Sequence, residues 1–185
     1  SEALGLGHAV MCAEPAVGDE PFAVILADDL IDDGDGDGCL AQMVARYDEQ
    51  VASILGVQRV PHDQVDRYGV VDVEPVAERL GQLKGIVEKP DPADAPSDLG
   101  VVGRYILNSS IFNKLRQTRP GSGGEIQLTD ALDALRQDEP VLAYEFMGTR
   151  YYCGDKLGYL QATVEYGLKH PELGPAFAEY LAQRG

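Results

Sequence analysis

The sequence predicts an α/β fold, in which a sheet of mainly parallel strands is flanked by helices. The segment FAVILA, residues 22–27, is apolar without alternation, which is typical of a strand that is covered on both faces. In residues 40–51 apolar side chains then recur at helical spacing, and residues 53–60 return to strand character. A strand, a helix and a second strand in this order predict a βαβ unit.

The remaining elements follow from the same periodicities. A short helix over residues 9–13 is expected after a glycine-containing start and is expected to stop at Pro15. Ser109 is expected to cap a later helix, and no interdomain linker is apparent, so residues 1–185 are expected to form one domain. Further strands are expected at residues 69–73, 83–89, 100–107 and 141–146, and further helices at residues 111–115, 126–135, 157–168 and 177–181.

The composition limits the class of protein. A chain of 185 residues with 44% apolar content can bury one sizeable core. Its net charge of −16, from 31 acidic and 15 basic side chains, argues against binding nucleic acid or an anionic membrane, because both reward clustered Lys and Arg. Three scattered cysteines favour a reducing cytoplasm over a disulfide framework. No apolar stretch approaches the roughly 20 residues that span a bilayer, and we expect a cytoplasmic protein of which this chain is a fragment.

Aspartates cluster just after the first strand. Asp33, Asp35 and Asp37 match the first half of a calcium loop, but the twelfth position is Val44 instead of the bidentate Glu that such a loop needs. We therefore interpret this segment as a solvated Asp/Gly turn. Asp28 differs, because it follows the predicted strand directly, where α/β sheets bind their ligands. Its carboxylate either holds Mg²⁺ beside nucleotide phosphates or caps the segment that follows.

A second candidate site lies in the segments YGVVD and GIVEKP. Glu88 can accept hydrogen bonds from sugar hydroxyls, and Lys89 can meet a phosphate as a point charge. Neighbours on a regular strand face opposite sides, so we expect Pro90 to distort the strand end and let both side chains reach one cavity. The alternative is an exposed ion pair. Gly69 either lets a ligand approach the backbone or only starts a strand after a turn.

Seven motifs occur in one order along the chain: GLGHAV, VGDEPFAVILADDLID, YGVVD, IVEKP, LGVVGRYIL, GEIQLTDAL and CGDKLGYLQATVEYGLKHPELG. In this combination the chain resembles the bacterial UTP:glucose-1-phosphate uridylyltransferases, or UDP-glucose pyrophosphorylases, over essentially its whole length. The resemblance implies a Rossmann-like, mixed, mainly parallel sheet of the nucleotide-diphospho-sugar transferase type. It also implies that glucose 1-phosphate attacks the α-phosphorus of UTP with the help of Mg²⁺, giving UDP-glucose and pyrophosphate, in a dimeric or tetrameric enzyme.

The resemblance assigns a nucleotide site and a metal site. Asp28 corresponds to the magnesium aspartate of the family and is expected to be catalytic, while Gly5 and Gly7 correspond to part of the uridine pocket. The family begins with a strand and a glycine-rich loop bearing Arg and Lys, and this chain starts after that region. We therefore expect residues 1–185 to be the C-terminal two-thirds of a nucleotidyltransferase domain, N-terminally incomplete and inactive alone.

The resemblance also assigns a sugar-phosphate site. Lys89 is expected to be catalytic and to hold the phosphate of glucose 1-phosphate. Glu88 and the backbone of Gly69 are expected to meet the glucose hydroxyls. Gly103 and Glu125 are expected to line the same cavity.

One residue departs from the pattern of the family. Tyr152 stands where relatives commonly have Asp before CG, a position that by analogy helps to bind metal. Asp155 and Lys156 follow it, and they serve either phosphate or metal, or only a solvated helix start. Two alternatives therefore stay open: a pyrophosphorylase for another nucleotide or sugar, and a noncatalytic relative that binds UDP-glucose or supports assembly.

Overall fold

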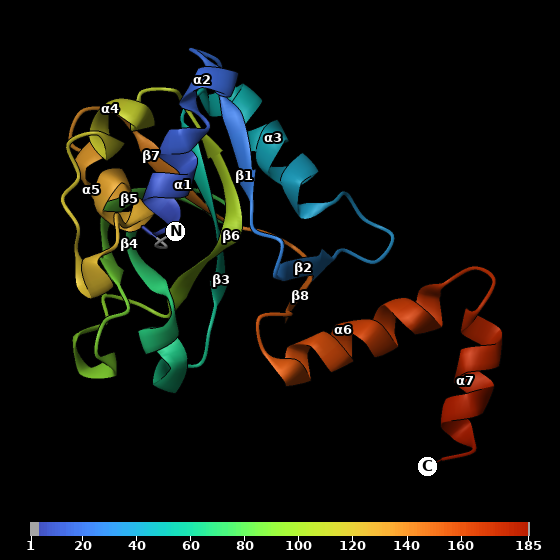
Figure 1. Cartoon of the computed structure of the whole chain (residues 1–185). Helices are drawn as coiled ribbons and strands as arrows, with labels where there is room; N and C mark the ends of the chain where they lie inside the picture. The colour runs from blue at the N-terminus through green and yellow to red at the C-terminus, as the bar shows by residue number, and fades with distance from the viewer. Residues whose placement is uncertain (1–3, 185) are drawn as a thin grey trace. The chain divides into compact units, whose positions relative to one another are not determined.

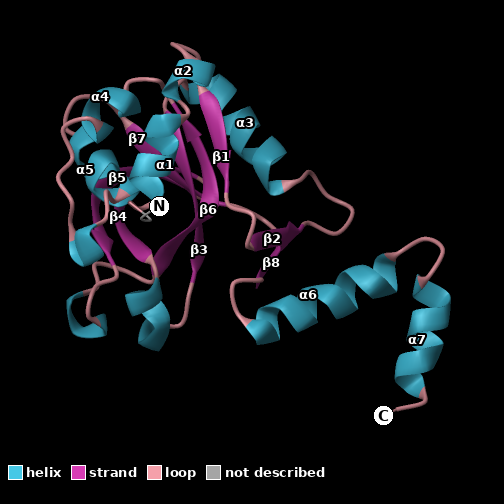
Figure 2. Ribbon diagram, in the orientation of Figure 1, coloured by secondary structure: helices cyan, strands magenta, loops and turns pink. Residues whose placement is uncertain are grey.

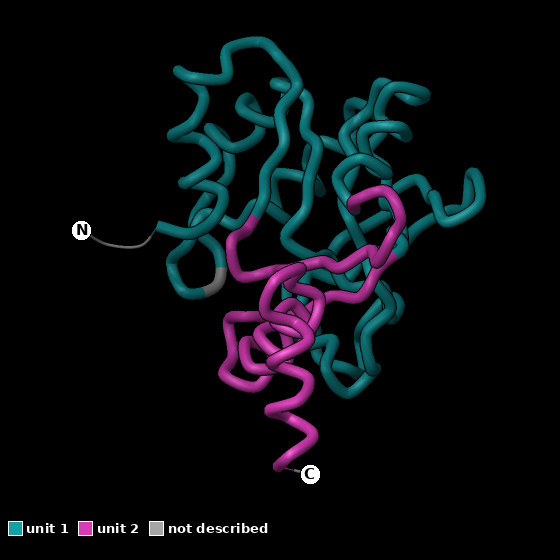
Figure 3. Tube along the Cα trace, turned by 90° about the vertical axis from the view of Figure 1, so that its right-hand side faces the viewer, with its two compact units in different colours: residues 1–25, 39–147 teal, residues 26–38, 148–185 magenta. Residues whose placement is uncertain are grey.

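The computed structural model describes residues 4–184 except for the side chain of Ser122, and the chain divides into two compact units (Figure 1). Unit 1 comprises Ser1–Ile25 and Cys39–Met147, and unit 2 comprises Leu26–Gly38 and Gly148–Gly185 (Figure 3). Each unit is built from two separate stretches of sequence. The chain crosses between the units after Ile25, Gly38 and Met147. The crossing after Gly38 follows the Asp/Gly turn, and the other two lie within three residues of a strand end, so no long linker marks the division in the sequence.

Unit 1 contains a six-stranded sheet in the order β1-β6-β3-β7-β5-β4, with a further pairing of β6 with β4 (Figure 2). The α/β class and the mixed sheet are confirmed. The expectation of a mainly parallel sheet is wrong for the described strands, since among them only β3 and β7 pair in parallel. The strands are β1 Phe22–Ile25, β3 Ser53–Arg59, β4 Gly69–Ala77, β5 Leu80–Glu88, β6 Leu99–Leu107 and β7 Val141–Glu145.

The predicted βαβ unit exists, with one strand inserted. Both β1 and β3 pair antiparallel with β6, so they run in the same direction on either side of it, and α3 (Cys39–Gln50) connects them. The prediction that residues 22–27 are covered on both faces is wrong. The strand ends at Ile25, whose side chain is exposed, and its residues alternate between half-buried and exposed because successive side chains point to opposite faces and one face is less covered.

Helices cover both faces of this sheet. Leu55 and Val57 of β3 join a core that includes Phe112 and Leu132, whereas Gly56 between them faces Met43 of α3. Because successive residues of a strand point to opposite faces, α3 lies on the face opposite this core. The helices that supply the core are α1 Leu6–Cys12, α4 Ile111–Leu115 and α5 Leu128–Leu135, and the short elements are α2 Glu14–Val17 and the 3₁₀ turns His62–Arg67, Pro92–Asp94 and Ser122–Gly124.

Two helix boundaries differ from the predicted ones. Pro15 does not end the first helix, which already ends at Cys12. Instead it lies in the first turn of α2, where its missing N–H is not needed. Ser109 does not cap α4, because its hydroxyl donates to the carbonyl of Asp19, and the helix begins after Ser110.

Unit 2 contains a two-stranded antiparallel sheet and two helices. The strands β2 (Asp29–Asp32) and β8 (Thr149–Tyr152) were not foreseen, because each has four residues and β2 begins and ends in aspartate, which is typical of turns. The helices α6 (Lys156–Lys169) and α7 (Gly174–Ala182) were predicted and are confirmed. Within residues 4–184, no helix combines the length and the apolar character that crossing a bilayer requires.

Candidate functional site

The last residue pair of the β4–β5 hairpin joins two of the predicted site residues. Gly69 and Glu88 lie opposite each other in the ladder. Glu88 is half-buried, and its Oε2 accepts a hydrogen bond from the Thr129 hydroxyl at 3.0 Å. Its other oxygen, Oε1, lies 3.8 Å from Nζ of Lys89, the next residue. A helix residue, a strand carboxylate and a lysine thus meet at one corner of unit 1.

Gly69 is needed at this corner for space. A Cβ atom at this position would lie 2.8 Å from Cγ2 of Thr129 and 3.3 Å from Oε2 of Glu88. Real Cβ atoms do not tolerate the first distance, so any side chain here would displace the threonine or the carboxylate. Gly69 is the first residue of β4, which agrees with the interpretation that it starts a strand after a turn. The other interpretation, that a ligand approaches its backbone, stays a prediction.

Lys89 has an uncommon backbone conformation. Its φ angle is +48°, in the left-handed region, and its N–H donates to the carbonyl of Tyr68 at 2.8 Å. Such a conformation costs a residue other than glycine on the order of 1–3 kcal/mol, so the surrounding structure must hold it in place. The predicted distortion of the strand end is confirmed, although it occurs in Lys89 itself, before Pro90. The Lys89 side chain is 62% exposed, so its ammonium is available to a ligand.

Gly5 and Glu125 are also brought together, through the backbone. The N–H of Gly7 donates to the carbonyl of Ile126, and the N–H of Ile126 donates to that of Leu4. Gly5 has a φ of +92°, and a Cβ atom there would lie 2.8 Å from Cβ of Glu125. The close approach of the two chain segments is thus enough to explain why glycine occupies positions 5 and 7. The contact of Gly5 and Gly7 with uridine stays a prediction.

Gly103 is buried within β6. Its carbonyl accepts a hydrogen bond from the guanidinium of its neighbour Arg104 at 3.0 Å. The expectation that it lines the sugar cavity stays a prediction.

In unit 2, two neighbouring aspartates have different environments. Asp29 is buried and forms an ion pair with Arg150, whose side chain is only 8% exposed. Asp28 is half-buried, and none of the described residues hydrogen-bonds to its carboxylate, although its backbone carbonyl accepts from Cys153. Asp29 is therefore structural, while Asp28 is available to bind a ligand.

The strand register explains where Tyr152 lies. It is the direct partner of Asp29 across the β2–β8 pair, and the Arg150 guanidinium lies 5.2 Å from the centre of its ring. Tyr152 thus shares its side of the strand pair with Asp29 and Arg150. Asp28 is instead reached by the next residue of that segment, Cys153, whose N–H donates to the carbonyl of Asp28. The phenol of Tyr152 is not a carboxylate, the kind of oxygen ligand that Mg²⁺ prefers in proteins.

The aspartates that follow form the predicted turn. Residues 34–38 are exposed, and the N–H of Gly36 donates to the carbonyl of Asp33. Asp32, at the end of β2, pairs with Lys169, and the hydrogen bond from this lysine holds the pKa of Asp32 below its usual value. The turn is thus attached to α6 through Asp32.

The available side chains restrict the kind of metal site that the chain can offer. Among residues 4–184, no three or more His, Cys, Asp and Glu side chains are grouped closely enough to hold a metal ion. Mg²⁺ at nucleotide phosphates is usually held by one or two carboxylates, phosphate oxygens and water. The available carboxylate of Asp28 fits this arrangement as the single protein ligand.

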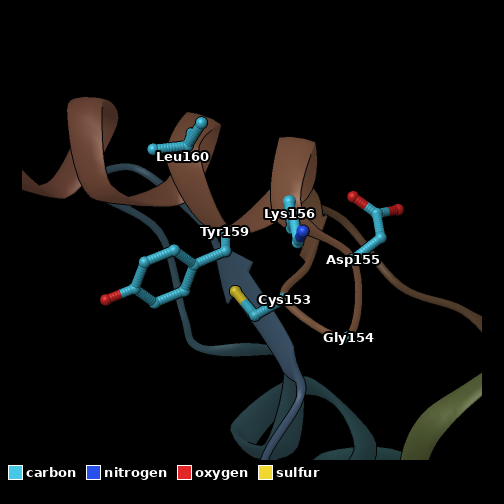
Figure 4. A pocket seen from close by; sticks show the side chains of 6 residues that line it. All are labelled: Cys153, Gly154, Asp155, Lys156, Tyr159 and Leu160. Atoms are coloured by element: carbon cyan, nitrogen blue, oxygen red, sulfur yellow. The ribbon is translucent and has the colours of Figure 1, made fainter.

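A cavity of about 390 Å³ lies at the start of α6 (Figure 4). Its lining includes the Cys153 thiol, the Tyr159 ring and Leu160. Asp155 is already used as the helix cap, since its carboxylate accepts from the N–H of Gly158 at 2.7 Å. The structure therefore favours the helix-start interpretation of Asp155 over a phosphate or metal role.

Two residues important to these sites were missed by sequence reasoning. Thr129 is 41 positions from Glu88, and Arg150 is 121 positions from Asp29. No local pattern connects such pairs. The one available signal for Arg150 was a single charge within the segment TRYYC, where it could have been expected to need a partner.

Comparison with known proteins identifies similar sequences over almost the whole chain. Residues 1–166 match the sequence model of the nucleotidyl transferase family. A UTP–glucose-1-phosphate uridylyltransferase of Pseudomonas aeruginosa is 49% identical over 162 residues, which are 88% of this chain and 58% of that protein. The protein of the same name from Escherichia coli K12 is 48% identical, and the match covers 98% of this chain and 61% of that protein. The chain therefore spans about three fifths of the length of these relatives.

Solved structures agree with the sequence matches. A UDP-glucose pyrophosphorylase in complex with UDP-glucose superposes with a TM-score of 0.89 and 44% identity over 92% of this chain and 64% of that one. A UTP-bound enzyme of this kind from Acinetobacter baumannii gives a TM-score of 0.88 and 45% identity over 98% of this chain and 62% of that one. Fold and sequence are thus similar to the same group of proteins.

We expect Gly5→Ala to destabilise the full-length protein by about 2–6 kcal/mol, because both the backbone angle and the space exclude a side chain. Gly18→Ala is the matched control, since Gly18 has a φ of +65° but a Cβ atom at this position would have nothing within 4 Å. The difference between the two variants, measured by urea unfolding, should be about 1–3 kcal/mol. Equal effects would contradict close packing at Gly5.

Asp29→Ala should lower the free energy of unfolding by about 3–5 kcal/mol, because it leaves Arg150 without its carboxylate in a buried position. Asp28→Ala should change it by less than about 0.5 kcal/mol. Urea unfolding of the two variants is the measurement. Similar losses of stability in both variants would contradict the assignment of a structural role to Asp29 and not to Asp28.

Proposed function

Because this chain belongs to the nucleotidyl transferase family, we propose that the protein containing it transfers the uridylyl group of UTP to glucose 1-phosphate and releases pyrophosphate. The observation that carries the proposal is the corner formed by Gly69, Glu88 and Lys89. It combines a fixed carboxylate, which accepts hydrogen bonds from hydroxyl groups, with an exposed ammonium, which attracts a phosphate. A sugar phosphate carries both of these groups. The names of the similar proteins and the bound UTP and UDP-glucose of the similar structures support the same reaction.

In the proposed reaction, a phosphate oxygen of glucose 1-phosphate attacks the α-phosphorus of UTP, and pyrophosphate leaves. No covalent enzyme intermediate is needed, so the side chains act by positioning and by electrostatic stabilisation. Lys89 holds the phosphate of the sugar near its target and offsets the negative charge. Glu88 and the backbone of Gly69 fix the orientation of the glucose ring.

Asp28 is the proposed protein ligand of Mg²⁺. The ion would neutralise the charge that accumulates on the phosphate oxygens. Tyr152, which lies opposite the neighbouring Asp29, brings no second carboxylate, so phosphate oxygens and water complete the proposed coordination. Gly5 and Gly7 belong to the proposed uridine pocket.

The proposal extends to the whole protein. Residues 1–185 are the C-terminal two-thirds of one nucleotidyltransferase domain, and the remaining part supplies a glycine-rich loop that holds the triphosphate. The chain alone is therefore inactive. Gly103 and Glu125 line the sugar cavity, and the protein is a cytoplasmic homo-oligomer.

A noncatalytic relative is the second candidate, and Tyr152 is the observation that favours it. A pyrophosphorylase for another base or sugar is a variant of the first proposal. Pyrophosphate release by the full-length protein, with a panel of nucleotides and sugar 1-phosphates, separates all three. Release with UTP and glucose 1-phosphate above all other pairs supports the proposal, and no release with any pair supports the noncatalytic relative.

Asp28→Asn should nearly abolish turnover by the full-length protein while leaving its fold intact, because a neutral amide binds Mg²⁺ much more weakly than a carboxylate. Asp35→Asn is the matched control, since Asp35 lies in the exposed turn. Steady-state rates with UTP and glucose 1-phosphate decide the matter. An active Asp28 variant, or an inactive Asp35 variant, would reverse the assignment.

Lys89→Ala should raise the KM for glucose 1-phosphate about tenfold to a hundredfold, the expected loss for one charge-assisted contact. The KM for UTP should change much less. Lys84→Ala should change neither constant, because it removes an exposed lysine of β5, the strand that ends just before Lys89, and this lysine pairs with Glu74. Equal increases for both substrates in the Lys89 variant would remove this residue from the sugar site.

A further inference from the structure

We infer that Thr129 is a positioning residue that determines which sugar is accepted, by holding the carboxylate of Glu88 in one orientation. The inference rests on the proposed role of Glu88 in the sugar site. Thr129 is only 8% exposed, and its hydroxyl donates to Oε2 of Glu88 at 3.0 Å. A carboxylate only accepts hydrogen bonds, so the direction of this bond is fixed and the hydroxyl is the donor.

The hydroxyl of Thr129 has no carbonyl of its own helix within reach. Thr163, inside α6, donates to the carbonyl four residues earlier at 2.7 Å, which is the usual choice of a helical threonine. Thr129 is the second residue of α5, so the residue four positions earlier, Glu125, precedes the helix, and its carbonyl accepts from the N–H of Gly121. Thr129 instead donates across unit 1 to the strand residue Glu88. Its position at the start of the helix thus leaves the hydroxyl available for the site.

Thr129 is itself held firmly. It is the second residue of α5, between the buried Leu128 and the helix core that includes Ala131 and Leu132. Its branched Cβ restricts the first side-chain torsion, and its Cγ2 methyl fills the space that Gly69 leaves open. Because the Thr129 hydroxyl has so little freedom, its hydrogen bond restricts the orientation of the Glu88 carboxylate.

The two oxygens of Glu88 consequently become different. Oε2 is occupied by Thr129, while Oε1 lies 3.8 Å from the Lys89 ammonium. A carboxylate fixed at one oxygen presents its remaining lone pairs in defined directions, and a sugar hydroxyl must lie in one of them. Hexose 1-phosphates that differ in the direction of a single hydroxyl are thus distinguished, as expected of a site built to hydrogen-bond its substrate. A carboxylate that rotates freely could accept a hydrogen bond from either orientation of that hydroxyl, and so would not distinguish the two sugars.

The test uses three variants of the full-length protein. Thr129→Val keeps the shape and removes the hydroxyl, and Thr129→Ser keeps the hydroxyl. Thr118→Val is the control, because it removes a hydroxyl that donates to the carbonyl of Lys114 and not to Glu88. We expect Thr129→Val to raise the KM for glucose 1-phosphate about tenfold, with a smaller change for UTP, and to lower by a similar factor the preference for glucose 1-phosphate over at least one of its epimers at C2, C3 and C4, which are mannose, allose and galactose 1-phosphate. Thr129→Ser and Thr118→Val should stay within about threefold of the wild type for both quantities.

Three outcomes would overturn the inference. They are an unchanged sugar preference in Thr129→Val, an equal loss in Thr129→Val and Thr129→Ser, and an equal rise of both KM values. Should the valine variant fail to fold, Thr129→Ala repeats the test, with serine again as the rescue. Failure of the proposed function appears differently: the wild-type protein would then neither use any sugar 1-phosphate nor bind UDP-glucose in calorimetry, and this overturns both proposals.

Discussion

The hydrogen bond from Thr129 to Glu88 is the contact around which unit 1 organises its candidate site. It connects the helix layer to the last residue of β5, and it requires Gly69 opposite to remain without a side chain. Just beyond it, the strand ends in the left-handed turn at Lys89, which the carbonyl of Tyr68 stabilises. A carboxylate with a fixed direction and a lysine with an exposed ammonium are the result, and both follow from packing at one corner of a sheet.

Unit 2 divides two roles between neighbouring aspartates. Asp29 of β2 is buried and paired with Arg150 of β8, so the charge pair connects the two strands of the short sheet. Breaking such a pair costs more than the pair contributes, because the charge left behind is desolvated. Asp28 keeps a carboxylate without a protein partner among the described residues. Asp28 therefore does not share Arg150 with Asp29, and its carboxylate is available to a ligand.

The sequence predicted those features that depend on local pattern. The long helices and the strands at 53–59 and 99–107 follow from periodicity, and the position of Glu88 and Lys89 follows from a recognisable motif. The mainly parallel pairing of the strands was predicted wrongly, because an apolar run in the sequence does not indicate whether the strands beside it run parallel or antiparallel to it. The sheet in unit 2, the left-handed Lys89 and the partners Thr129 and Arg150 depend on contacts between distant segments. Apart from the lone charge of Arg150 in the segment TRYYC, such contacts leave no local pattern in a single sequence.

A crystal structure of the full-length protein with UDP-glucose tests the sugar site most directly. Our account predicts a glucose hydroxyl within about 2.5–3.2 Å of a Glu88 carboxylate oxygen, while Thr129 still donates to the other oxygen. It also predicts that the Lys89 ammonium lies beside the phosphate attached to the sugar. A glucose ring that makes no hydrogen bond to Glu88, or a Glu88 carboxylate turned away from Thr129, would contradict the account.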